Sequence, residues 1–220
     1  MIIAIDGPSG TGKSTVAQGL ARQLNFLYFD TGAMYRCFTY FLLQNHINFE
    51  DHDAIIKSLK EFDFDIKIED GQYHYFLNEQ DVSLAIRQEK VSEMASKIAK
   101  NPFVRQELLP IQRVFGHKSN IVMEGRDIGT VIFPNADLKI FLNADLKVRT
   151  QRRVDQLKQK FGTNSDPAQV LQEMEKRDAQ DSNRSIAPLK QAEDAIVIDT
   201  THLNADQVIA MIVKLTSSFL

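Results

Sequence analysis

The sequence predicts an α/β fold with a five-stranded, mainly parallel sheet and helices on both of its faces. The first observation is a set of short apolar runs that helical stretches separate, at residues 2–5, 26–29, 121–123, 138–142 and 195–198. The second is a glycine-rich segment directly after the first run. The third is a change to period-two alternation between residues 62 and 82, which interrupts the order of strands and helices.

Composition narrows the class of protein. Of 220 residues, 43% are hydrophobic and 25% are charged, which is typical of a globular chain large enough for one domain. The net charge of −3 argues against a protein that coats nucleic acid. The single cysteine, Cys37, excludes an intrachain disulfide and a multi-thiolate zinc site. We expect a cytoplasmic protein without a membrane partner, because no apolar stretch has signal or membrane length.

The first run is predicted to be a buried parallel strand, because it is short, β-branched and followed at once by a glycine-rich turn. Val16, Leu20 and Leu24 then recur at helical spacing over residues 14–24. A strand, a glycine loop and a helix form a βα unit. In such sheets ligands bind beyond the carboxyl ends of the strands, so the loops there are expected to hold the chemistry.

The glycine-rich segment satisfies the pattern G-x-x-x-x-G-K-[ST] with the residues Gly7, Pro8, Ser9, Gly10, Thr11, Gly12, Lys13 and Ser14. Glycines let backbone N–H groups wrap phosphate oxygens, and the helix N-terminus adds its positive end. Lys13 is expected at the β- and γ-phosphates and the Ser14 hydroxyl at Mg²⁺. A turn with a stray lysine is the alternative, and the flanking strand and helix argue against it. The segment predicts nucleoside triphosphate binding.

The period-two segment predicts a small antiparallel insert. Its alternating apolar residues are Phe64, Ile66 and Ile68 before the turn Asp70-Gly71, and Tyr73, Tyr75 and Leu77 after it. A second excursion, residues 146–184, contains two charged helical stretches joined near residues 162–167. That junction is either a hinge or a plain loop.

Two loops after predicted strands offer groups for a second anionic ligand. In residues 30–36, Thr31 and the N-terminus of a helix can meet an acceptor, with Arg36 about one turn inside that helix, although Asp30 or Thr31 could be only an N-cap and Arg36 only a surface residue. In residues 124–130, two glycines are expected to free the backbone and so present Arg126 and Asp127. A loop salt bridge is the alternative there.

The second excursion adds two charged helix faces. Arg149, Arg152 and Arg153 fall on one side of a helix, which suits a lid over phosphates or, equally, a solvated basic face. Arg177, Asp181 and Arg184 also share a face. Alternating charges of that kind usually form pairs within their own helix.

Four segments in this order resemble the bacterial cytidylate kinases: GPSGTGKST, DTGAMYR, EGRDIGTVIFPNADLKIFLNA and RDAQDSNR. The resemblance covers nearly the whole chain. It implies a three-layer P-loop kinase fold in one domain, residues 1–220, which transfers phosphate from ATP to CMP and dCMP with Mg²⁺. It further implies a core (1–30, 103–145 and 185–220), a nucleoside monophosphate (NMP) binding portion with the insert (31–102) and a helical lid (146–184).

The resemblance also implies roles for individual residues. Residues 7–15, ending at Thr15, would hold ATP, and Arg149, Arg152 and Arg153 would act from the lid. The positions that match CMP contacts in the family are Thr31, Arg36, Ser96, Arg105, Arg126, Asp127, Arg177, Asp181 and Arg184. Among these, cytosine would be read by Ser96, Arg126 and Asp127, the phosphate by Arg36, Arg105 and Arg126, and the sugar by Asp181.

Two positions depart from the family pattern. Thr31 replaces a common serine and keeps the hydroxyl, and Glu124 replaces a common aspartate, which would move the carboxylate nearest Mg²⁺ by one methylene. The alternatives to a CMP kinase are a kinase of the same architecture with another acceptor, a nucleotide-dependent switch, and a nucleic-acid binder. The chain lacks the N-K-x-D motif of GTPase switches and a basic aromatic stripe. ATP and CMP or dCMP are therefore the expected partners, and a monomer the expected state.

Overall fold

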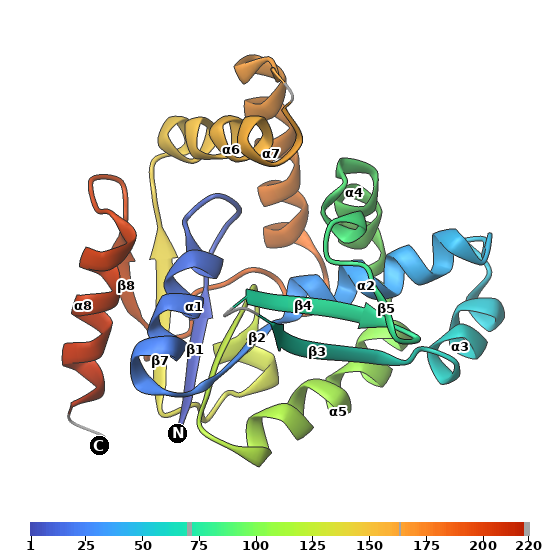
Figure 1. Cartoon of the computed structure of the whole chain (residues 1–220), viewed down its shortest axis with the longest axis horizontal. Coiled ribbons are helices and arrows are strands. Elements are labelled where there is room, and N and C mark those ends of the chain that lie inside the picture. Colours follow the sequence, from blue (N-terminus) through green and yellow to red (C-terminus); the bar gives the residue numbers. More distant parts are fainter. Residues whose placement is uncertain (70–71, 163, 218–220) are drawn as a thin grey trace. The chain divides into compact units, whose positions relative to one another are not determined.

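The structure is a computed structural model that describes residues 1–69, 72–162 and 164–217. The chain divides into two compact units, one formed by residues 1–29 and 113–220 and the other by residues 30–112. Figure 1 shows the elements of both along the chain. Within the described ranges, no helix is long and apolar enough to cross a bilayer.

The first unit is built on a five-stranded sheet with the strand order β2-β6-β1-β7-β8. The strands are β1 (Ile2–Asp6), β2 (Leu27–Asp30), β6 (Ile121–Gly125), β7 (Leu138–Asn143) and β8 (Ile196–Asp199). β1 runs parallel to both β6 and β7, and β7 runs parallel to β8. The predicted α/β class and all five predicted strands are confirmed.

Ile3, Ala4 and Ile5 of β1 are wholly buried, which explains why β1 is a continuous apolar run rather than an alternating one. α1 (Lys13–Leu24) packs against β1, β6 and α8 (Ala205–Thr216). The contact with α8 is close, since a Cβ atom on Gly19 would lie 2.4 Å from Ile209 Cδ1. Elsewhere in the unit, Phe115 of α5 (Pro102–Lys118) lies with its ring 4.7 Å from that of Phe29 on β2.

The second excursion forms two helices, α6 (Leu146–Phe161) and α7 (Pro167–Asn183). Their N-caps are both aspartates, Asp145 for α6 and Asp166 for α7. The C-cap of α6 is Gly162, which has a φ of 66°. The helices share a small apolar cluster of Leu157, Val170 and Met174. The predicted junction therefore contains a glycine C-cap and, after it, an N-cap followed by proline.

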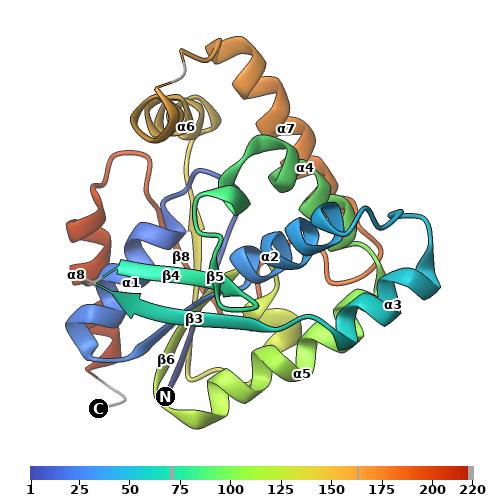
Figure 2. The ribbon, with the colours of Figure 1, turned by 45° about the vertical axis from the view of Figure 1, so that its right-hand side comes forward.

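The second unit contains α2 (Thr31–Gln44), α3 (His52–Lys60), α4 (Glu89–Ile98) after a short turn of helix (Ala85–Arg87), and the predicted antiparallel insert. The insert consists of β3 (Phe64–Glu69), β4 (Gln72–Leu77) and β5 (Gln80–Asp81). Phe64 pairs with Leu77 and Ile66 with Tyr75, as the alternation requires, and Figure 2 shows the two long strands side by side. The predicted turn at Asp70-Gly71 lies outside the described residues. β5 was not predicted, because two residues are too few to show alternation.

An aromatic cluster joins the insert to α2. Phe62 lies at the centre, with ring distances of 5.2 Å to Phe38, 6.2 Å to Phe41 and 5.8 Å to Phe64. The Phe64 ring in turn stacks on that of Tyr75, which is wholly buried. The insert therefore has an apolar anchor on the helix that begins at Thr31.

Candidate active site

The phosphate loop, residues 7–14, joins β1 to α1 at the carboxyl end of the strand. Its glycines have positive φ, with 148° at Gly7, 78° at Gly10 and 91° at Gly12. A Cβ atom on Gly7 would lie 2.1 Å from the Leu142 carbonyl oxygen, so a side chain cannot be accommodated there. Gly12 is the N-cap of α1 and supplies no side-chain cap, so it does not compete with an anion for the first N–H groups of the helix.

Lys13 is folded back onto the loop that contains it. Its Nζ atom donates to the Pro8 carbonyl oxygen at 2.6 Å and lies 3.5 Å from Thr11 Oγ1. Burial and, next, the Arg126 guanidinium lower the pKa of Lys13 to about 7. An incoming phosphate would supply the negative charge that raises this pKa again.

Two buried carboxylates lie at the carboxyl ends of the central strands. Glu124 Oε1, on β6, accepts a hydrogen bond from the Tyr28 hydroxyl at 2.7 Å. Asp6, on β1, accepts from the backbone N–H groups of Ile128 and Gly129 at 2.9 and 2.8 Å. Burial raises the pKa of Asp6 to about 6, against the opposing effect of both backbone hydrogen bonds. Asp6 is therefore mostly ionised at neutral pH and tied to the segment that follows β6.

A metal ion would have to bind here with few protein ligands. Across the described residues no group of three or more His, Cys, Asp or Glu side chains could hold a metal. Mg²⁺ between phosphates needs no such cage, because it retains several waters and takes one or two protein ligands. The exposed Ser14, in the first turn of α1 directly after Lys13, offers an oxygen of the kind that Mg²⁺ prefers.

Arg149 of α6 is held against the phosphate loop. Its Nε donates to the Ala144 carbonyl oxygen at 3.0 Å, and its Nη1 donates to the Ser9 carbonyl oxygen at 3.0 Å and to Asp178 Oδ2 at 2.5 Å. Asp178 Oδ1 also accepts from the Ser9 N–H at 3.2 Å. One carboxylate of α7 therefore contacts both the arginine of α6 and the loop.

The other two arginines of α6 have different partners. Arg152 donates to the Thr200 carbonyl oxygen at 2.6 Å and to its Oγ1 at 3.1 Å. The Thr200 hydroxyl donates to the Thr11 carbonyl oxygen at 3.0 Å, which connects Arg152 to the phosphate loop through one residue. Arg153 contacts Gln156 of its own helix at 2.7 Å.

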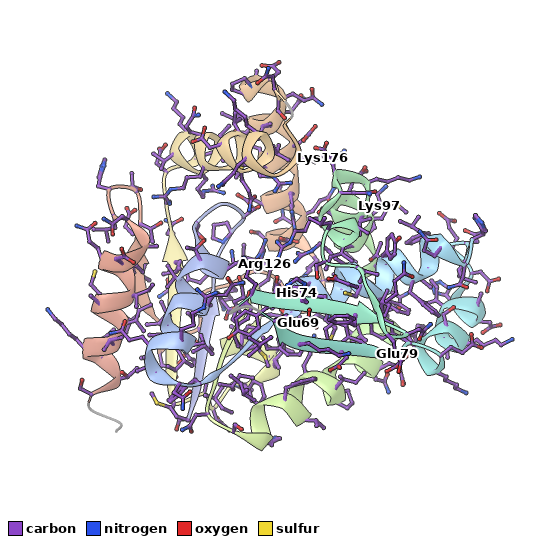
Figure 3. The ribbon with its side chains drawn as sticks, viewed as in Figure 1. Glu69, His74, Glu79, Lys97, Arg126 and Lys176 are labelled. Atoms are coloured by element: carbon purple, nitrogen blue, oxygen red, sulfur yellow. The ribbon has the colours of Figure 1, made fainter. Side chains whose placement is uncertain are left out.

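The charged residues near the end of α7 pair with the loop after β6. Asp181 Oδ2 lies 2.9 Å from Arg126 Nε, and Asp127 Oδ1 lies 3.2 Å from Arg184 Nη2; Arg126 is labelled in Figure 3. Burial would raise the pKa of Asp181, but Arg126, then Arg177 and Arg184, lower it overall. Two carboxylates and three guanidinium groups are therefore gathered in this part of the first unit.

One expectation about these residues is incomplete and another is wrong. Asp181 and Arg184 pair with Arg126 and Asp127 of the loop after β6, in addition to the electrostatic interaction of Asp181 with Arg177 of its own helix, and Arg184 follows the last residue of α7 with extended backbone. The glycines of residues 124–130 do not act through backbone freedom, since the positive-φ glycines of the described chain lie elsewhere. Gly129 instead provides space, because a Cβ atom there would lie 3.1 Å from Lys139 Cδ.

The second unit contains the remaining predicted acceptor residues. Asp30 is the N-cap of α2, as one alternative held, and accepts from the Ala33 N–H at 2.8 Å. The alternative that Arg36 is only a surface residue is wrong, because its side chain is 14% exposed and its Nη2 lies 2.8 Å from Asp30 Oδ2. Burial would raise the pKa of Asp30, but Arg36 and the Ala33 N–H lower it. Arg36 Nε is buried without a hydrogen-bond partner in the described structure.

Other groups in this unit lie close to α2. Arg105 donates to the Ala99 carbonyl oxygen at 3.3 Å, and its guanidinium lies 5.7 Å from the centre of the Tyr35 ring. Thr31 is buried at the start of α2, and Ser96 is half-buried on α4, which packs against α2.

Sequence reasoning did not assign a role to Asp6 or Asp178. Asp178 directly follows Arg177 and was inside a recognised segment, whereas Asp6 fell between the first apolar run and the phosphate loop. Nothing in the spacing showed that their partners are backbone N–H groups of distant segments.

Comparison with known proteins decides between the kinase families that share such a loop. Residues 3–218 match the family described as cytidylate kinase. The chain is 46% identical over 217 residues to the cytidylate kinase of Protochlamydia amoebophila, covering 97% of this chain and 95% of that protein. The chain belongs to the cytidylate kinase family.

A second relative agrees with this family assignment. The cytidylate kinase of Caldicellulosiruptor bescii is 46% identical over 213 residues, covering 97% of this chain and 94% of that protein. A solved structure of an uncharacterized protein from Eubacterium ventriosum aligns with a TM-score of 0.53 over 99% of each chain at 16% identity, which bears on the fold alone. The predicted membership of the cytidylate kinase family is therefore confirmed.

Proposed function

We propose that this chain transfers the γ-phosphoryl group of ATP to the phosphate of CMP and dCMP, giving ADP with CDP or dCDP. The observation that carries the proposal is the family match over residues 3–218. The pairing of Arg126 with Asp181 and of Arg184 with Asp127 supports it, because these groups offer both guanidinium and carboxylate partners to a nucleotide acceptor.

The donor is assigned to residues 7–15. The backbone N–H groups at the start of α1 and the Lys13 ammonium would face the phosphates of ATP. Lys13 would then exchange its hydrogen bond to the Pro8 carbonyl oxygen for phosphate oxygens. Ser14 would hold Mg²⁺, which would supply positive charge to the phosphates of ATP.

The acceptor is assigned to the nine positions that match CMP contacts in the family, which are Thr31, Arg36, Ser96, Arg105, Arg126, Asp127, Arg177, Asp181 and Arg184. The phosphate of CMP is assigned to Arg36, Arg105 and Arg126, the cytosine to Ser96, Arg126 and Asp127, and the sugar to Asp181. Arg36 Nε is a buried donor that suits this role, since leaving such a group unsatisfied is costly.

The chemistry requires positioning and charge stabilisation more than proton transfer. A phosphate dianion is already a nucleophile, so no general base is assigned. Arg149 and Arg152 are assigned to the transferring group, and their contacts with the carbonyl oxygens of Ser9 and Thr200 support this assignment. Arg153 is assigned to the same lid, residues 146–184, whose closure would exclude water and prevent wasteful hydrolysis of ATP.

The deciding experiment measures ADP formation from ATP and Mg²⁺ with CMP, dCMP, UMP, AMP and GMP offered separately at equal concentrations. Strong turnover with CMP and dCMP and weak turnover with the others is the expected result. Turnover that favours AMP or UMP would overturn the acceptor while keeping the kinase. ATP consumption that needs no acceptor would overturn phosphoryl transfer itself.

A Lys13→Ala variant is the matched control, because it removes the loop's ammonium group. Full transfer by this variant would contradict the donor assignment. We propose further that the protein is a cytoplasmic monomer, and light scattering at assay concentrations tests the monomer. A dimer mass would overturn it.

A further inference from the structure

The turn that follows Arg126 and Asp127 is capped by Asp6, the last residue of β1. This turn, Ile128–Ile132, has Asp127 as its N-cap residue, yet Asp127 makes no side-chain cap hydrogen bond. The first two N–H groups of the turn instead donate to Asp6, Ile128 to Oδ1 at 2.9 Å and Gly129 to Oδ2 at 2.8 Å.

This arrangement determines what Asp127 can do. An aspartate at a cap position ordinarily folds back onto the N–H groups two or three residues ahead. Here Asp6 already accepts from the Gly129 N–H, which is one of those donors, and from the adjacent Ile128 N–H, and the Asp127 carboxylate is directed to Arg184 at 3.2 Å. The cap function and the ligand-binding function are therefore divided between two aspartates.

Asp6 also connects two loops with different tasks. It is the last residue of β1 and directly precedes Gly7 of the phosphate loop, while its hydrogen bonds fix residues 126–129, called here the acceptor loop. The fit is close, because a Cβ atom on Gly129 would lie 3.5 Å from Asp6 Oδ2 and 3.1 Å from Lys139 Cδ. Asp6 itself is 5% exposed.

We propose that Asp6 is a positioning residue for the acceptor: by capping the acceptor loop in place of Asp127, it leaves the Asp127 carboxylate and Arg126 side chain directed to CMP. This inference rests on the proposed function. It assigns Asp6 to acceptor affinity and not to ATP affinity, although Asp6 is next to the ATP loop in sequence. If Asp6 is changed, Asp127 becomes the local cap and withdraws from the acceptor.

The test compares Asp6→Asn with the parent protein by calorimetric titration of CMP and of ADP separately. The N–H groups of Ile128 and Gly129 need two acceptor oxygens, and asparagine offers one. Its NH₂ group would face the other N–H group, so that two donors meet without an acceptor. We expect the Kd of CMP to rise at least tenfold, while the Kd of ADP changes less than twofold. An equal change in both constants, or a CMP change below twofold, overturns the proposal.

A double-mutant cycle identifies the route of the effect. If Asp6 acts through Asp127, Asp6→Asn should weaken CMP binding much less in an Asp127→Asn background than in the parent. An undiminished effect in that background would contradict this route. Faster hydrogen exchange of the Ile128 and Gly129 amides in Asp6→Asn should accompany the change and does not depend on the acceptor.

Two controls separate positioning from stability. Asp137→Asn removes a carboxylate that accepts the Ile2 N–H at 2.6 Å at the opposite end of β1, and should leave the Kd of CMP unchanged. Ile212→Val removes a methyl group from the buried side of α8 and so destabilises the protein, and it should also leave the Kd of CMP unchanged. If Asp6→Asn does not fold, Gly129→Ala crowds the loop against Lys139 Cδ, 3.1 Å from the added Cβ atom, with both carboxylates retained, and the same selective loss of CMP affinity is expected.

The assay with the five nucleoside monophosphates distinguishes a failure of this inference from a failure of the proposed function. If the parent protein prefers another monophosphate, that acceptor replaces CMP in the titrations, and the predicted selectivity over ADP is tested with it. A loss of acceptor turnover in the parent concerns the function, whereas an unselective Asp6→Asn effect concerns only Asp6.

Discussion

Arg126 Nε lies 2.9 Å from Asp181 Oδ2, so a side chain of the loop after β6 is paired with one from the last turns of α7. Both side chains are largely buried, with exposed fractions of 18% and 8%. A buried pair of this kind contributes little as a unit, but loss of one partner leaves a charge uncompensated. The pair therefore connects α7 to residues 126–129, and removing either partner would leave a largely buried charge.

Asp181→Asn should destabilise the protein by about 3 kcal/mol at pH 7, because three guanidinium groups then lack this carboxylate. The folded-state pKa of Asp181 is lowered, so its contribution is present above the usual aspartate pKa of 3.8 and is lost as the pH falls below it. Urea unfolding of the two proteins should give a stability difference that shrinks from pH 7 to pH 3. A constant difference would contradict the charge interaction.

Nucleotide binding should take up protons. The pKa of Lys13 is about 7 in the protein without nucleotide, and phosphate oxygens should raise it, so affinity for ADP should fall as the pH rises from 7 to 9. Calorimetry in two buffers of different ionisation enthalpy should show uptake of up to one proton at pH 8. Lys13→Arg is the control, since its guanidinium stays protonated. Equal uptake by both proteins would exclude Lys13 as the proton acceptor.

Asp178→Asn should lower kcat more than it raises the KM of CMP. The carboxylate holds Arg149 at 2.5 Å and the Ser9 N–H at 3.2 Å, and loss of a charge-assisted hydrogen bond costs about 1.5–3 kcal/mol, or about 10-fold to 160-fold in rate. Steady-state kinetics measure the effect. Asp155→Asn on α6 is the matched control, because that exposed carboxylate accepts from the Gln151 side chain of its own helix at 2.9 Å, and the change should leave both constants unchanged.

Phe62→Ala should destabilise the second unit by about 3–5 kcal/mol, because the ring is 9% exposed and touches the rings of α2 and β3. Hydrogen exchange should accelerate in β3 and β4 and remain slow in β1. Phe103→Ala, on a ring that is 47% exposed, should cost much less. Equal losses for both variants would show that the aromatic cluster does not anchor the insert.

The fold was predictable because its signals are local. Residues 2–14 give an apolar strand, a glycine pattern and a helix start in sequence, and the alternation around Ile66 and Tyr75 gives the hairpin pairing. The partners of charged side chains were not predictable by spacing. The interval between Arg177, Asp181 and Arg184 is helical, but burial against the acceptor loop gives Asp181 and Arg184 better partners than their neighbours in the helix. Asp6 was missed because its partners are backbone groups more than a hundred residues away.

The strand order also bears on how the chain is made. β1 pairs with β6 from Ile121 onward and with β7 from Leu138 onward, so during synthesis the strand that precedes the phosphate loop has no neighbour until more than half of the chain has emerged. Residues 30–112, by contrast, form a contiguous unit that contains its own hairpin and helices. The order of emergence therefore allows the second unit to fold before the first. In the first unit, the short apolar strand β1 stays unpaired, and so exposed to aggregation, until β6 and β7 have been translated.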